Sequence, residues 1–168
     1  MKLVFSKNSS VVSKLIRFIT NEDVSHCGFI VEPILTVIHA NFLGTHAEFI
    51  KSFNKRSTIV YCLEVPMTSE DEIELYKSYL IKNCGRPYDF GGIVYFGVRI
   101  ILNRLFSMPI PERNLWSDSS YDYCVEALCR LSPALTGIKG ENEMLSPKGF
   151  YLKAREVLMT CPDCSSSI

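Results

Sequence analysis

The stretch Tyr121-Asp-Tyr-Cys-Val-Glu-Ala-Leu128 changes from polar to apolar at Cys124, and from that point it is compatible with a helix. Cys124 is therefore expected in the first turn of a helix. Backbone N–H groups and the helix dipole favour the thiolate there, and the thiolate is the reactive form of cysteine. The quoted stretch predicts a helix that presents a nucleophilic sulfur at its N-terminus.

A second stretch, Ser25-His-Cys-Gly-Phe-Ile-Val31, begins with polar residues and continues as an apolar run of the strand type. A cysteine at a helix start and a histidine at a strand start can act as a pair in which the imidazole takes the thiol proton. His39 follows on the next predicted strand and can orient the His26 ring. We predict Cys124 as nucleophile, His26 as general base and acid, and His39 as the third member.

Further hydrogen-bond donors are expected beside the sulfur. The backbone N–H of Cys124 can stabilise an oxyanion, because helix N-termini direct such groups outward. Tyr121 or Tyr123 can add a hydroxyl donor or assist substrate binding, although an aromatic of the core or rim is the simpler interpretation of either. Glu126 is interpreted as a structural partner of the first helical turn.

The remaining segments alternate between strand and helix patterns. The basic segment Lys51-Ser-Phe-Asn-Lys-Arg56 is interpreted as a solvated turn. The pattern indicates an α+β fold, in which a small antiparallel sheet packs against helices. We predict one domain over residues 1–158 and a flexible tail over 159–168. Strands are predicted at Lys2–Phe5, His26–Val31, Leu35–Asn41 and Thr58–Val65, helices at Val11–Ile19, Ser69–Cys84, Phe90–Phe106, from Cys124 and at Pro147–Leu158, and a loop at Met108–Trp116.

Composition limits the classes of function. The chain has 168 residues, of which 47% are hydrophobic and 21% charged, the balance of one folded domain. Its formal net charge is zero, so no basic field favours nucleic acid as a partner. The longest apolar stretch, Phe90–Leu102, contains Arg99 and falls short of the roughly 20 residues that span a bilayer. We therefore expect no transmembrane segment and, without a secretory signal, a cytoplasmic location.

The other cysteines and the third histidine are given structural interpretations. The pair Cys161-Pro-Asp-Cys164 supplies only two of the four ligands of a structural zinc site, so we predict no metal and no cofactor. His46 is interpreted as a surface histidine. We expect four cysteines to act as small buried hydrophobic residues, namely Cys27, Cys62, Cys84 and Cys129.

The order of these motifs resembles a known family. An early Ser-His-x-Gly strand, a following strand with a polar residue and a late Tyr-x-x-Cys-x-Glu helix are similar to the circularly permuted papain-like cysteine hydrolases of the NlpC type. The similar branch includes the YiiX/YebB-like proteins and is related to lecithin retinol acyltransferase. The segments 3–17, 86–90 and 146–150 also fit its pattern, so the resemblance covers most of the chain.

The resemblance implies a permuted papain-like fold and a cysteine hydrolase that cleaves amide bonds through the triad Cys124, His26 and His39. The implied substrate is a peptide of peptidoglycan, so cell-wall fragments are the expected partners. An acyltransferase or thioesterase acting on lipid or acyl substrates is the first alternative. A binding or assembly module that keeps the fold without catalysis is the second. The substrate and the oligomeric state stay open at this point.

Overall fold

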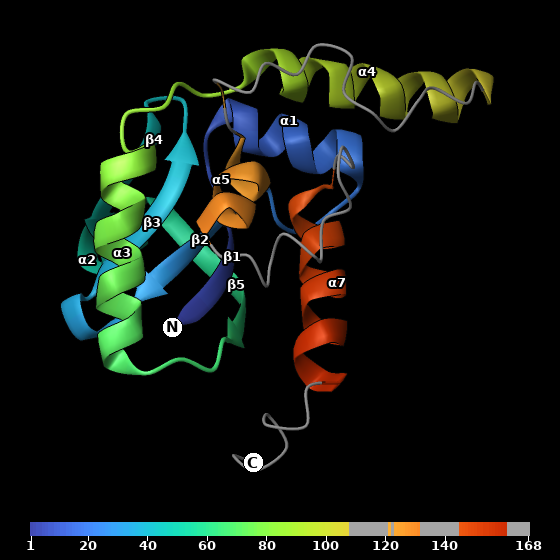
Figure 1. The fold of residues 1–168 in the computed structure, drawn as a ribbon. Helices are drawn as coiled ribbons and strands as arrows, with labels where there is room; N and C mark the ends of the chain where they lie inside the picture. Colours follow the sequence, from blue (N-terminus) through green and yellow to red (C-terminus); the bar gives the residue numbers. More distant parts are fainter. Residues whose placement is uncertain (108–120, 122, 132–144, 161–168) are drawn as a thin grey trace.

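The computed structural model describes residues 1–107, 121, 123–131 and 145–160. Five strands within these ranges form one antiparallel sheet in the order β4-β3-β2-β1-β5 (Figure 1). β1 pairs with both β2 and β5, and β2, β3 and β4 follow one another as a meander. The strands are β1 (Lys2–Asn8), β2 (His26–Val31), β3 (Thr36–Asn41), β4 (Gly44–Phe49) and β5 (Ser57–Glu64).

Helices cover both faces of this sheet. α5 lies across β2 and β3 and α7 against β1, while α4 runs beside α1 (Figure 1). The α+β prediction is confirmed by this mixture of one antiparallel sheet with helices. The helices are α1 (Val11–Thr20), α2 (Ile50–Arg56), α3 (Ser69–Asn83), α4 (Phe90–Phe106), α5 (Cys124–Leu131) and α7 (Pro147–Thr160), with a 3-10 turn, η1 (Glu32–Ile34).

Alternation along the strands divides the apolar side chains between two clusters. The larger cluster joins Leu3, Phe29 and Ile38 to side chains of α5 and α7. The smaller one joins Val4 and Val37, with Ile30, to Phe53 of α2. Because α2 covers its own side of the sheet, most residues of β1, β2 and β3 are buried on both faces, and these strands give rigid support to side chains at their ends.

Several local predictions are wrong. Cys62 and Cys84, which were expected to be buried, are exposed. The basic segment 51–56 is not a solvated turn but most of α2, and it buries Phe53 against the sheet. α3 is capped by Thr68, because the Thr68 hydroxyl accepts a hydrogen bond from the backbone N–H of Asp71. His46 lies partly exposed on β4, and this strand is one that the sequence did not indicate.

The ends of the predicted elements otherwise agree with the structure to within a few residues. Ser146 caps α7, since its hydroxyl accepts a hydrogen bond from Gly149 N–H. α7 ends at Thr160, two residues beyond the predicted domain boundary, and residues 161–168 lie outside the described residues, as does the loop predicted at Met108–Trp116. No helix of the described part is long and apolar enough to cross a membrane.

A glycine allows β2 and β3 to approach each other at the end that carries the two histidines. A Cβ atom on Gly28 would lie 2.9 Å from the Ile38 carbonyl oxygen and 3.2 Å from the Cβ of His39. The ladder between the strands runs only from Phe29–Ile38 to Val31–Thr36, so Gly28 and His26 lie beyond its end. The short contact at Gly28 therefore sets the distance between the two histidine-bearing strands.

Replacing Gly28 with alanine is expected to destabilise the protein by about 1–3 kcal/mol, because the added methyl group overpacks against β3. It should also slow alkylation of Cys124 by separating His26 from His39. Urea unfolding and iodoacetamide labelling measure the two effects. Gly91→Ala is the matched control, since a Cβ there meets only the Asp89 carboxylate, at 3.4 Å. Equal effects of the two substitutions would contradict the close approach at Gly28.

Candidate active site

Cys124 is the first residue of α5 and is buried, with 2% of its surface exposed. The helix start is fixed locally, because the Glu126 carboxylate accepts a hydrogen bond from Tyr123 N–H at 3.4 Å and the Tyr123 carbonyl accepts one from Ala127 N–H. The structural interpretation of Glu126 agrees with this contact. α5 packs on β2 and β3, and its N-terminus therefore meets the strands that carry the two predicted histidines.

The thiol of Cys124 lies among groups that stabilise its thiolate. Hydrogen bonding from the side chain of Cys27 is the largest influence that holds the pKa of Cys124 well below its usual range, and a hydrogen bond and charge interaction with His26 act in the same direction. Burial opposes them. The structure therefore brings Cys124 and His26 together, as the sequence predicted, and adds Cys27 as a partner.

The sequence did not predict the contact between Cys27 and the Cys124 sulfur. It is buried, as expected of a small hydrophobic residue, but its thiol and its backbone N–H both interact with Cys124. Burial, followed by the hydrogen bond to Cys124, raises the pKa of the Cys27 thiol well above its usual value. Cys27 therefore keeps its proton and donates it in a hydrogen bond to the neighbouring sulfur.

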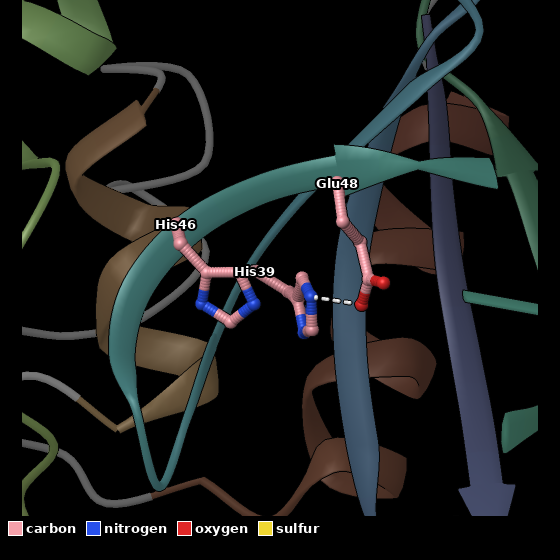
Figure 2. A group of neighbouring side chains, drawn as sticks. All are labelled: His39, His46 and Glu48. Atoms are coloured by element: carbon pink, nitrogen blue, oxygen red, sulfur yellow. Dashed lines mark hydrogen bonds and ion pairs between the residues drawn. The ribbon is translucent and has the colours of Figure 1, made fainter. Parts of the chain in front are cut away.

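Three side chains from consecutive strands continue the chain of contacts beyond Cys124. His26 Nε2 lies 2.8 Å from His39 Nδ1, and His39 Nε2 lies 2.9 Å from Glu48 Oε1. Figure 2 shows His39 between β4 and the strand behind it, with its bond to Glu48 drawn. The second carboxylate oxygen of Glu48 pairs with Arg56, which is 60% exposed. The predicted third residue thus meets His26 and has a carboxylate partner of its own.

The hydrogen-bond partners of His26 and His39 determine which ring nitrogens carry protons. A carboxylate only accepts, so His39 Nε2 carries the proton that is donated to Glu48. His39 is neutral, which leaves Nδ1 as an acceptor, and His26 must then donate from Nε2. Nδ1 of His26 is consequently the nitrogen that can exchange a proton with Cys124. His39 and Glu48 share a hydrogen bond between a neutral ring and an anion rather than an ion pair.

Acidification is expected to destabilise the protein through His39. Burial first, and then the charges of His26, His46 and Arg56, lower the pKa of His39 to about 2. The unfolded chain takes up this proton near pH 6.5, so the stabilising contribution is complete above that pH and is lost as the pH falls towards 2. Urea unfolding with a chelator present should show a loss of about 2 kcal/mol between about pH 7.5 and about pH 5.

The His39→Gln variant serves as the comparison for this pH dependence, because it keeps a polar side chain but cannot titrate. Its free energy of unfolding should change much less over the same interval. A wild-type protein whose stability stays constant down to about pH 5 would show that folded His39 takes up a proton in that range.

The tyrosines considered as hydrogen-bond donors differ in exposure and in the partners of their hydroxyl groups. Tyr121 is 40% exposed, and the Tyr123 hydroxyl accepts a hydrogen bond from Leu145 N–H at 3.3 Å. Tyr88 was not predicted as a site residue, although it belongs to the stretch 86–90. Burial, followed by the charges of Cys124 and Cys27, raises the pKa of Tyr88 well above its usual value. Tyr88 therefore keeps a protonated hydroxyl that interacts electrostatically with the two sulfurs.

An apolar cavity of about 270 Å³ ends at the start of α5. Its walls are mainly side chains of α1 and α4, and Tyr123 and Cys124 are among its lining residues. A few polar groups, including Ser25 and Ser146, lie along its edge. The apolar side chains of the two helices that line it are Val12, Leu15, Ile16 and Ile19 of α1 and Ile93, Val94, Phe96, Val98 and Ile101 of α4.

Sequence reasoning missed Glu48, Cys27 and Tyr88. Glu48 lies on β4, whose residues Gly44–Phe49 show little apolar alternation, so neither the strand nor its carboxylate was expected. Two signals in the sequence could have indicated the other residues. Cys27 is next to His26 in the sequence, and Tyr88 lies in the stretch 86–90 that fits the family resemblance. The predicted residues Cys161 and Cys164 lie outside the described residues.

Comparison of the chain with models of known families, with curated proteins and with solved structures found no match.

Proposed function

We propose that the chain is a cysteine hydrolase that forms an acyl-enzyme on Cys124. The observation that carries this proposal is the continuous series of contacts from Cys124 through His26 and His39 to Glu48. A helix that carries the nucleophile packs on a sheet that carries the histidines, in the chain order His, His, Cys. This arrangement also supports a permuted papain-like fold as part of the same proposal.

In the proposed reaction, the Cys124 thiolate attacks a carbonyl carbon, and the backbone N–H of Cys124 stabilises the oxyanion. The proton held at His26 Nδ1 passes to the leaving group as the bond to carbon breaks, which leaves the acyl group on sulfur. A water molecule then gives a proton to His26 and attacks the thioester, and the acid is released with the Cys124 sulfur restored. His39 and Glu48 position the His26 ring throughout, and neither gains or loses a proton.

The first candidate substrate is an amide of a peptidoglycan peptide. It rests on the resemblance to NlpC-type hydrolases, in which this is the expected activity. The nucleophile and base do not distinguish an amide from an ester, because both pass through the same thioester intermediate. Amide cleavage makes the greater demand on His26, since an amine must be protonated as it leaves.

The second candidate substrate is an ester or thioester with an apolar acyl chain, and the cavity beside Cys124 favours it. A volume of about 270 Å³ holds about nine methylene groups if each takes up roughly 30 Å³, the volume share of a water molecule. Small-molecule sites are commonly apolar with few polar groups, as this cavity is. A polar cell-wall peptide would leave that apolar surface unfilled.

Tyr88 is expected to assist the reaction as a hydrogen-bond donor to the oxyanion. Tyr88→Phe should lower turnover by about 10–100-fold, somewhat less than the loss of a fully enclosed donor, while leaving the unfolding free energy within about 1 kcal/mol. Steady-state kinetics and urea unfolding measure the two effects. Tyr121→Phe is the control, since the exposed Tyr121 should tolerate the same change. Equal turnover in both variants would remove Tyr88 from the site.

A substrate panel with intact-protein mass spectrometry tests the proposal. The protein is incubated with muropeptides, to detect new amines, and with 4-nitrophenyl esters and acyl thioesters of increasing chain length. An acyl adduct on Cys124 with either class of product supports the hydrolase. No product and no adduct with any substrate would favour the binding module and overturn the enzyme.

A cavity-filling variant separates the two substrate candidates. A Cβ at Gly97 would lie 3.6 Å from Ile19 Cδ1, so Gly97→Leu directs its side chain towards the cavity wall formed by α1. It should slow the cleavage of long acyl chains and spare short ones if the cavity holds the chain. Unchanged chain-length dependence, together with amine release from muropeptides, would assign the peptidase instead.

A further inference from the structure

Three side chains at the far end of the contact series gather their polar atoms in one place. His39, His46 and Glu48 each offer one ligand atom, and these atoms lie within 4.8 Å of one another. Figure 2 shows His46 and Glu48 projecting from β4 on either side of His39. β3 and β4 set this arrangement, because His39 pairs with His46 in the antiparallel register and Glu48 follows two residues later on the same face.

A hydrogen bond to the backbone directs a lone pair of His46 toward His39 and Glu48. His46 Nδ1 lies 3.0 Å from the carbonyl oxygen of Gly44, which only accepts, so this nitrogen carries the proton. Nε2 of His46 therefore has the lone pair, and Figure 2 shows one ring nitrogen of His46 facing His39. A histidine whose second nitrogen donates to a backbone carbonyl is in the tautomer that metal sites use.

We propose that His39 Nε2, His46 Nε2 and Glu48 Oε1 form a binding site for Zn²⁺, and that the bound ion stops the turnover proposed for Cys124. Two histidines and a glutamate, with water as the fourth ligand, are a ligand set that zinc uses in proteins. The inhibitory half of this inference rests on the proposed function. The binding half does not.

The geometry requires only small movements. Two ligand atoms on a tetrahedral zinc ion lie roughly 3.4 Å apart when each bond is about 2.0–2.1 Å. His39 Nε2 and Glu48 Oε1 are already 2.9 Å apart, so the ion would replace the hydrogen bond between them. β4 is an edge strand of the sheet, and the partial exposure of His46 and Glu48 provides a path from solvent. Arg56 holds the other oxygen of Glu48 and opposes the ion by its charge.

Zinc at His39 Nε2 reverses the hydrogen bond between His39 and His26. The proton on His39 Nε2 leaves, and a proton moves from His26 Nε2 to His39 Nδ1, which now donates to His26. The His26 nitrogen that faces Cys124 keeps its proton and still donates to the sulfur. Cys124, His26 and His39 together held three protons before zinc bound, two on His26 and one on His39. They hold two afterwards, one on each ring, so one proton is released. Cys124 remains a thiolate, but His26 is now neutral, and the one proton it keeps is far less acidic than the imidazolium proton that a leaving group requires.

Calorimetry with Zn²⁺ tests the binding half without any substrate. The full chain with Cys161→Ser and Cys164→Ser is titrated in two buffers that differ in ionisation enthalpy, so that tail thiols do not compete and released protons are counted. We expect one Zn²⁺ per chain. His46→Gln should weaken binding at least tenfold, and Arg56→Gln should tighten it severalfold by removing a competing cation.

Cys124→Ala provides a separate signature, because the site contains no sulfur. Zn²⁺ affinity should be unchanged in this variant, while the number of protons released should fall by about one. Substituting Co²⁺ for Zn²⁺ should give a spectrum without a thiolate charge-transfer band. A thiolate band, or wild-type affinity in His46→Gln, would overturn the site.

Iodoacetamide labelling and turnover test the inhibitory half. At saturating Zn²⁺, turnover should be lost while Cys124 is still alkylated, because the ion leaves the thiolate in place. His46→Gln should keep both its turnover and its labelling at the same Zn²⁺ concentration. Loss of labelling with zinc would place the ion on the sulfur instead. Full turnover in zinc-saturated protein would overturn the inhibition, and calorimetry would then decide the binding half separately.

Discussion

Turnover is expected to fall by at least about 10³-fold when Cys124 is replaced with alanine, because the variant cannot form the thioester on which both half-reactions depend. The loss should appear with every substrate that the wild-type protein cleaves, and the acyl adduct should disappear from the intact-protein mass spectrum. Steady-state kinetics at saturating substrate measure the effect. The fold should survive, since the substitution removes a single buried sulfur at a cost of about 1 kcal/mol.

Cys129→Ala is the matched control for this experiment. Cys129 lies on the same helix and is also buried, so the same atom is removed from a similar environment. Its turnover should stay close to that of the wild-type protein. If Cys124→Ala retains turnover, or if both variants lose it to the same extent, Cys124 is not the nucleophile and the loss reflects the packing of α5.

Alkylation of Cys124 by iodoacetamide is expected to slow by about 10–100-fold at about pH 6.5 when His26 is replaced with alanine. His26 is one of the groups that hold the pKa of Cys124 low, so its removal decreases the thiolate fraction at that pH. Mass spectrometry of labelled peptides gives the rate for each cysteine. Cys62 is an internal reference, because desolvation raises the pKa of its thiol and it should react slowly in both proteins.

His46→Ala separates the effect of His26 from that of a histidine nearby. The His46 ring centroid lies 4.4 Å from that of His39, yet His46 bonds to the Gly44 carbonyl and not to His26. Labelling of Cys124 should be unchanged in this variant. Should Cys27 or Cys161 prove the fastest cysteine, with no effect of His26→Ala, the activation of Cys124 would have to be abandoned.

Local patterns were sufficient for most of the fold. The apolar runs at His26–Val31 and Thr58–Val65 predicted two of the strands, and the polar-to-apolar change at Cys124 predicted the start of α5. These patterns succeed because burial on one or both faces requires apolar residues at regular intervals. The contact between His26 and His39 also followed, since two strands joined by a short turn become antiparallel neighbours.

Contacts that depend on non-local packing could not be predicted. Glu48 became visible only with β4, a strand that is held mainly by its pairing with β3 and whose sequence is largely polar. Cys27 meets Cys124 only because α5 packs across β2, and Tyr88, in the segment before α4, interacts electrostatically with both. In a single sequence, nothing separates Cys27 from any other small buried residue, so its role depends on the assembled structure.

The order of the elements along the chain has a consequence for biosynthesis. β2, β3 and β4 are joined by short turns, so His26, His39 and Glu48 can come together while the second half of the polypeptide is still being made. α5 is added much later, and only its docking supplies the sulfur and places it beside Cys27 and His26. We therefore expect the nascent chain to hold an imidazole pair with no acidic thiol, and the reactive group to be completed late in folding.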